Sequence, residues 1–131
     1  MDAYNADVVP DPEQWLALSV EERRRLVLRH HRGRVERTLH REGYRRELHA
    51  KLHQLVEDQI ARREPAVTGE TVARLQAEGL RRHAALHAVI EVLVRGLAAG
   101  TDGIAFGAAL QALKAGDWLG EQMRRDLGAP E

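Results

Sequence analysis

The chain of 131 residues has a formal net charge of zero and 44% hydrophobic residues. These values predict one globular domain, residues 1–131, whose core is large enough to fold without metal or disulfides. The chain contains no cysteine, which excludes disulfides, thiolate metal sites and a cysteine nucleophile and fits a reducing cytoplasm. No run approaches the roughly 18 apolar residues of a membrane span, and the acidic N-terminus lacks the apolar segment of a signal peptide. We therefore expect a cytoplasmic protein without membrane contact.

Two helix-start signals lie near the beginning of the chain. Asp11, followed by a proline, predicts the start of a short helix, because both residue types are typical of helix N-termini. Ser19 and Glu22 have the spacing of a capping box and predict a second helix. Residues 1–10 and 127–131 show no periodicity, so we expect a loose N-terminal arm and a flexible tail.

The strongest helical patterns lie in the middle of the chain. In residues 45–63 and 82–99, leucine, valine and isoleucine recur at spacings of three and four. Pro65 and Gly100 are expected to end these two helices. Residues 34–44 show too weak a pattern to assign.

Shorter helices are predicted on either side of the second strong segment. Thr68 or Thr71 is expected to cap a helix that ends near Gly79, and Asp102 to cap one that ends near Gly116. No segment alternates with period two in β-branched residues, so strands are not expected. The predicted fold class is all-α, a helical bundle of about five to six helices in which the two strongest are central and antiparallel.

Both central helices carry the pattern His-x-x-x-His-x-x-x-Glu. Residues four apart lie on one face of a helix, so each helix presents two imidazoles and a carboxylate along one stripe. Two matching triplets in a chain with seven histidines predict a metal site. The six candidate ligands are His49, His53, Glu57, His83, His87 and Glu91.

Antiparallel packing would place His53 opposite His87 and a carboxylate at each end of the paired stripes. Each triplet spans about 12 Å, so one ion cannot reach both ends. One ion can be bound by His49, His53 and Glu91 and a second by Glu57, His83 and His87, or a single ion by His53, His87 and one glutamate. These ligands favour zinc or iron, with manganese or nickel as further candidates, and metal-assisted hydrolysis or redox chemistry. No catalytic residue, organic cofactor or substrate can be named.

A non-enzymatic interaction module is the alternative. Its histidines would hydrogen-bond carboxylates across the helix pair, His49 with Glu91 and His83 with Glu57. They would lie at the edge of a core whose apolar stripes include Leu48, Leu52 and Leu55. Such a module can be a homodimer, and the arginine-rich stretch from Arg23 to Arg46 would give it a basic face. Nucleic acid is a disfavoured partner, because net charge is zero and aromatic residues are few. The other histidines, His30, His31 and His40, are expected at the surface.

Several stretches resemble an uncharacterised bacterial family of small all-helical domains with paired His-x-x-x-His helices. They are residues 49–59 with the following Pro65, residues 71–75 and residues 79–89, and residues 11–16 resemble the lead-in of some members. The resemblance covers about residues 11–95 and implies a bacterial cytoplasmic protein but no particular activity. Members do not all carry a carboxylate at the position of Glu91, so the resemblance implies a role for the four histidines more strongly than for Glu91.

Overall fold

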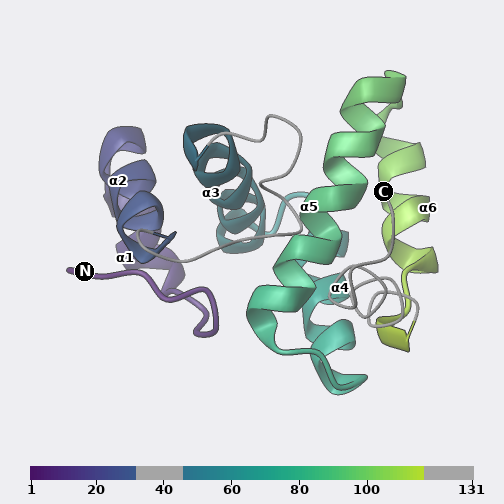
Figure 1. Cartoon of the computed structure of the whole chain (residues 1–131), viewed down its shortest axis with the longest axis horizontal. Coiled ribbons are helices and arrows are strands. Elements are labelled where there is room, and N and C mark those ends of the chain that lie inside the picture. Colours follow the sequence, from purple (N-terminus) through teal and green to yellow (C-terminus); the bar gives the residue numbers. More distant parts are fainter. Residues whose placement is uncertain (32–45, 117–131) are drawn as a thin grey trace, which may run out of the picture.

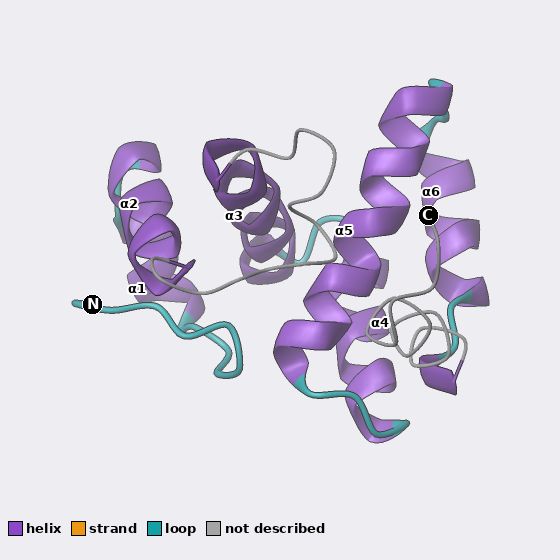
Figure 2. Ribbon diagram, viewed as in Figure 1, coloured by secondary structure: helices purple, strands orange, loops and turns teal. Residues whose placement is uncertain are grey.

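A computed structural model describes residues 1–31 and 46–116, and within these ranges it contains six α-helices and no strand (Figures 1 and 2). The helices are α1 Pro12–Ala17, α2 Val20–His31, α3 Arg46–Arg62, α4 Ala66–Ala77, α5 Arg82–Ala99 and α6 Gly103–Ala112. The all-α bundle expected from the sequence is thereby confirmed. The unassigned residues 34–44 and the expected tail at residues 127–131 lie outside the described residues.

Helix α3 lies in the middle of the arrangement, with α1 and α2 on one side and α4 and α5 on the other (Figure 1). Helix α6 packs on α4 and α5 at the far end. Contacts across the α3–α5 pair run in opposite directions, since His49 lies beside His87 while Glu57 lies beside Arg82. The two strongest helical patterns therefore form a central antiparallel pair, as the sequence predicted.

Most of the predicted helix boundaries are confirmed by their capping contacts. The Asp11 carboxylate accepts from the N–H of Gln14, and the Asp102 carboxylate accepts from the N–H of Ala105. Ser19 and Glu22 exchange the two hydrogen bonds of a capping box. Both α3 and α5 end within one residue of the predicted limits.

Two boundary predictions are wrong. Helix α4 begins directly after Pro65 rather than at a threonine cap, and Thr68 and Thr71 lie within the helix with buried side chains. The Thr68 hydroxyl instead donates to the Gln59 side chain on α3. Helix α6 ends at Ala112, four residues before the glycine expected to end it.

The core contains an apolar part and a polar part. Its largest fully buried apolar side chains include Trp15, Leu75, Leu86, Ile90 and Leu110. Helix α3 buries polar side chains beside apolar ones: His49, His53, Gln54 and Glu57 are at most 5% exposed, and Ala50, Leu52 and Val56 are buried with them. Leu48 and Leu55 on the same helix are 46% and 41% exposed. The α3 histidines therefore lie inside the core rather than at its edge, and of the expected leucine stripe on this helix only Leu52 is buried.

The N-terminal arm is docked against the bundle rather than loose. Tyr4 is 5% exposed and Ala6 is fully buried. The Tyr4 ring packs against Trp15 and His30, with ring centroids 5.6 and 5.4 Å apart. Burial of a single aromatic ring is enough to stabilise the docked segment. Because one residue leaves no periodic pattern in the sequence, periodicity did not predict this contact.

In the part of the chain that the structure describes, no helix is both long enough and apolar enough to cross a membrane.

Candidate metal centre

Three histidines from the central helix pair form a buried cluster, here called the histidine trio: His49 and His53 from α3 and His87 from α5. His49 and His53 have no exposed surface, and His87 is 7% exposed. One ring nitrogen from each can be chosen so that all lie within 4.8 Å of one another. Among the described residues this is the one group of three or more histidines and carboxylates that could hold a metal ion.

The distances within the trio are short enough for its three imidazoles to bind one metal ion. The Nε2 atoms of His53 and His87 are 3.1 Å apart, which confirms that these residues face each other across the helix pair. Two nitrogens bound to a tetrahedral zinc ion at about 2.1 Å lie about 3.4 Å from each other. The ring centroid of His49 is 4.6 Å from that of His53 and 5.1 Å from that of His87. Small side-chain movements would therefore bring three imidazoles onto one ion.

His83 and His30 extend the cluster toward the N-terminal segment. The His83 ring centroid is 4.3 Å from that of His87 and 5.3 Å from that of His53. His30 lies half-buried, 5.5 Å from His83 between ring centroids, so its predicted surface position is wrong. The side chains of His31 and His40 lie outside the described part of the chain. His83 thus borders the trio without joining the group of possible ligands.

Glu57 is held by other residues instead of completing the trio. Its two carboxylate oxygens accept from the Arg82 guanidinium, each at 2.8 Å, and one of them also accepts from the Tyr4 hydroxyl. Glu57 is 1% exposed and Arg82 is 4% exposed. A buried charge pair needs such complete hydrogen bonding to offset the loss of hydration. The second ion considered from the sequence, bound by Glu57, His83 and His87, thereby loses its carboxylate ligand.

Burial and charge at this pair shift two pKa values. Burial raises the pKa of Tyr4 well above its usual value, and the adjacent Glu57 carboxylate raises it further. Burial by itself would lower the pKa of Arg82, but the hydrogen bonds and charge of Glu57 outweigh it, so this pKa is raised. Tyr4 is therefore neutral and Arg82 charged at neutral pH.

Glu91, the remaining predicted ligand, lies on α5 one turn beyond His87. Its carboxylate accepts from the Arg95 guanidinium, four residues farther along the same helix. It does not belong to the group formed by the trio. Of the six residues predicted from the sequence, the structure brings three histidines together, places His83 beside them and directs Glu57 toward Arg82.

Three residues near the site were not expected from the sequence: Tyr4, Asp7 and Arg82. Asp7 accepts from the backbone N–H of His83 and pairs with Arg81, so it caps α5 from a distant part of the chain. Arg82 could have been predicted from the antiparallel register of the two central helices, because that register places it next to the carboxylate of Glu57. No periodic signal existed for Tyr4 or Asp7, which act through tertiary contacts.

The predicted basic face is also changed by the structure. Arg23 is 5% exposed, and its guanidinium donates to Asp58 at 2.7 Å and to the carbonyl of Leu18. Asp58 also accepts from the indole N–H of Trp15. Arg23 therefore joins α2 to α3 inside the protein and is unavailable to an acidic partner.

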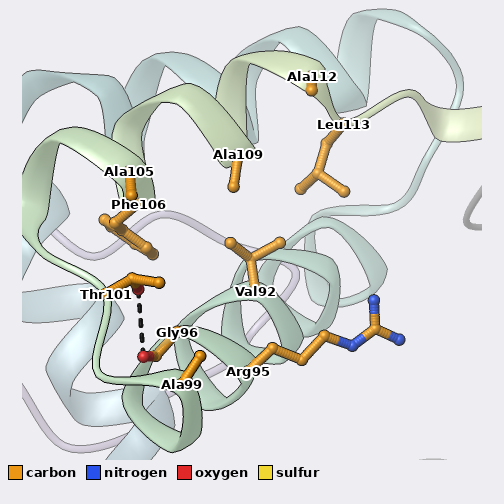
Figure 3. Close-up of a pocket in the computed structure, with 10 residues that line it drawn as sticks. All are labelled: Val92, Arg95, Gly96, Ala99, Thr101, Ala105, Phe106, Ala109, Ala112 and Leu113. Atoms are coloured by element: carbon orange, nitrogen blue, oxygen red, sulfur yellow. Dashed lines mark hydrogen bonds between the residues drawn. The ribbon is translucent and has the colours of Figure 1, made fainter.

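A hollow of about 470 Å³ lies apart from the trio, between α5 and α6 (Figure 3). Its lining is mainly small and apolar, with Val92 and Leu113 facing each other and Phe106 at one end. The Thr101 hydroxyl donates to the carbonyl of Gly96, and the Arg95 side chain extends along the rim. Because few polar groups converge there, this hollow is a weaker candidate for chemistry than the trio.

No protein-family model, curated protein or solved structure matches the chain.

Proposed function

We propose that this protein binds one divalent metal ion through His49, His53 and His87, between helices α3 and α5. The observation that carries the proposal is that three buried histidines each have a ring nitrogen within 4.8 Å of a ring nitrogen of the other two. Nitrogens this close can bind the same ion. Histidine is the commonest metal ligand in proteins. Three imidazoles whose ring nitrogens converge in the core are the kind of ligand set that holds a catalytic zinc ion.

Three imidazole ligands favour zinc or iron as the ion. Neutral imidazole binds both metals, and the chain offers no thiolate that would select for softer ions. Three protein ligands leave a fourth position of a tetrahedral zinc site for water or a substrate, which is the arrangement of catalytic rather than structural zinc. An ion held in this way would act as a Lewis acid or activate its bound water.

The test is the metal content of untagged protein after incubation with Zn²⁺ or Fe²⁺ and removal of unbound ion. The expected result is one ion per chain in the wild type and none in the double variant His53→Ala, His87→Ala. His83→Ala is the matched control, because His83 contacts the same rings but lies outside the trio. It should retain one ion per chain.

Other outcomes would contradict the proposal in recognisable ways. Two ions per chain, with loss of one in His83→Ala, would support two separate sites instead of one. Metal-free wild type after incubation with either ion would favour a structural role. In that case the 3.1 Å contact between His53 and His87 is a hydrogen bond in which one ring nitrogen donates and the other accepts.

A further inference from the structure

We infer that binding of the metal ion and docking of the N-terminal strap, defined as residues 4–7, stabilise each other. The inference rests on the proposed metal site and adds a means of regulating it. The strap contacts the two helices that supply the trio, one helical turn away from the ligands. Occupancy of the site and order in the strap are then coupled through a shared helix pair.

The strap contacts both central helices through specific polar contacts. The Tyr4 hydroxyl donates to Glu57 of α3. The carbonyl of Ala6 accepts from Arg82 of α5 at 3.1 Å, and the Asp7 carboxylate accepts from the N–H of His83 at 3.1 Å. Tyr4 and Ala6 are both buried, so these contacts form only when the strap is seated.

The same helix pair is joined at two adjacent levels. At one level His53 of α3 meets His87 of α5, and one turn farther along α3 Glu57 meets Arg82. A turn of helix is about 5.4 Å, so both levels depend on the same spacing and register of α3 and α5. An ion that fixes the first level therefore favours the geometry to which the strap binds at the second.

His83 provides the most direct connection between the levels. Its backbone N–H is bonded to the strap through Asp7. Its ring lies beside His87 and His53, with ring centroids 4.3 and 5.3 Å away. Release of the strap would remove the cap of α5 and loosen the turn that carries this ring. His87 lies one turn farther along the same helix. Its ring would then be less ordered, and the affinity for the ion would fall.

Coupling of this kind is reciprocal, because two ligands of one conformation change each other's apparent affinity by the same factor. The strap can be treated as an internal ligand of the α3–α5 pair. A partner that captured residues 4–7 would lower the metal affinity, and loss of metal would expose the strap. Exposure of residues 4–7 would then depend on whether the metal site is occupied.

The first measurement is hydrogen exchange of the full, untagged wild type with and without Zn²⁺ or Fe²⁺. The amide of His83, bonded to Asp7, reports directly on the seated strap, and the amides of Asp7 and Val8, bonded to Asn5, report on the turn within and next to it. We expect their exchange to slow by about tenfold when the ion is bound, a typical size for such coupling.

The second measurement is the metal affinity of the double variant Tyr4→Phe, Asp7→Asn, by competition with a chelator. It should bind Zn²⁺ about tenfold more weakly than the wild type. Asp102→Asn is the matched control, since the Asp102 carboxylate also accepts from an N–H in the first turn of a helix, α6, but does not contact the strap. The control should keep the wild-type affinity.

The failure of this inference can be told apart from failure of the proposed function. Wild-type protein that binds neither ion overturns both. Wild-type protein that binds an ion with unchanged exchange at Asp7, Val8 and His83 overturns only the coupling. If the double variant does not fold, the exchange measurement on the wild type decides the question. Equal affinities of a folded double variant and the wild type also overturn the coupling.

Discussion

The two ends of the bundle differ in what they bury. Where α4, α5 and α6 meet, the core is apolar, with Leu75, Ile90 and Leu110 almost completely removed from water. Around α3, the interior contains Arg23 bonded to Asp58 on the side of α2, and the trio together with Glu57 bonded to Arg82 on the side of α5. Apolar burial supplies stability without direction, whereas buried polar groups need specific partners. The candidate site therefore lies in the part of the core that is filled by polar groups with specific partners rather than by apolar side chains alone.

The largest expected effect comes from removing one partner of the buried ion pair. Arg82→Leu should destabilise the protein by about 3–5 kcal/mol, because it leaves the Glu57 carboxylate buried and uncompensated. The free energy of unfolding from urea denaturation measures this cost. In the double variant Glu57→Gln, Arg82→Leu the buried charge is gone, so much of the stability should return. A double variant as unstable as Arg82→Leu would mean that the pair is needed for packing rather than for charge balance.

A smaller effect is expected from the Tyr4 hydroxyl, and it depends on pH. Tyr4→Phe should cost about 1.5–3 kcal/mol near neutral pH, since it removes a hydrogen bond to a charged acceptor. The pKa of Tyr4 is raised in the folded protein, so the unfolded chain loses this proton first as the pH increases. Stability from the phenol is therefore fully present below about pH 10, the unfolded value, and declines above it.

Urea denaturation between about pH 8 and about pH 11 would measure this decline. The wild type should lose more stability over this interval than Tyr4→Phe, so the difference between the two curves should narrow at the alkaline end. Parallel curves would show that Tyr4 does not titrate differently in the folded and unfolded states.

The smallest effect is expected on the outer face of α3. Leu48→Gln and Leu55→Gln should each change the free energy of unfolding by no more than about 0.5 kcal/mol, as is usual for exposed positions. A loss of several kcal/mol in either glutamine variant would mean that another part of the molecule covers this face.

In contrast, His49→Leu on the inner face of α3 should abolish metal binding, although it adds an apolar side chain to the core.

The apolar part of the core could be predicted from the sequence more completely than the polar part. Periodicity predicted α3 and α5, since Leu86, Ile90 and their neighbours recur at helical spacing, and capping residues predicted the starts of α1, α2 and α6. The pairing of His53 with His87 followed from the antiparallel register. Periodicity did not predict which face of α3 is buried, because a leucine stripe and a histidine stripe both fit a helix.

The contacts of the strap lay beyond prediction for a different reason. Tyr4 and Asp7 belong to no periodic segment, and each bonds to a residue more than 50 positions away. Glu57 was predicted as a metal ligand because its spacing from His53 matches the helix period. Its actual partner depends on an arginine that the ligand pattern does not include.

The long-range cap of α5 bears on the order in which the protein forms. Asp7 and the amide that it accepts from are 76 positions apart, whereas the caps of α1, α2 and α6 are three positions apart. Local contacts close quickly, and contacts that span a long loop are delayed by the entropy of closing it. During synthesis, residues 4–7 would leave the ribosome long before the start of α5 exists. The contacts of residues 4–7 with Arg82 and His83 can therefore form only after α5 has begun to be made.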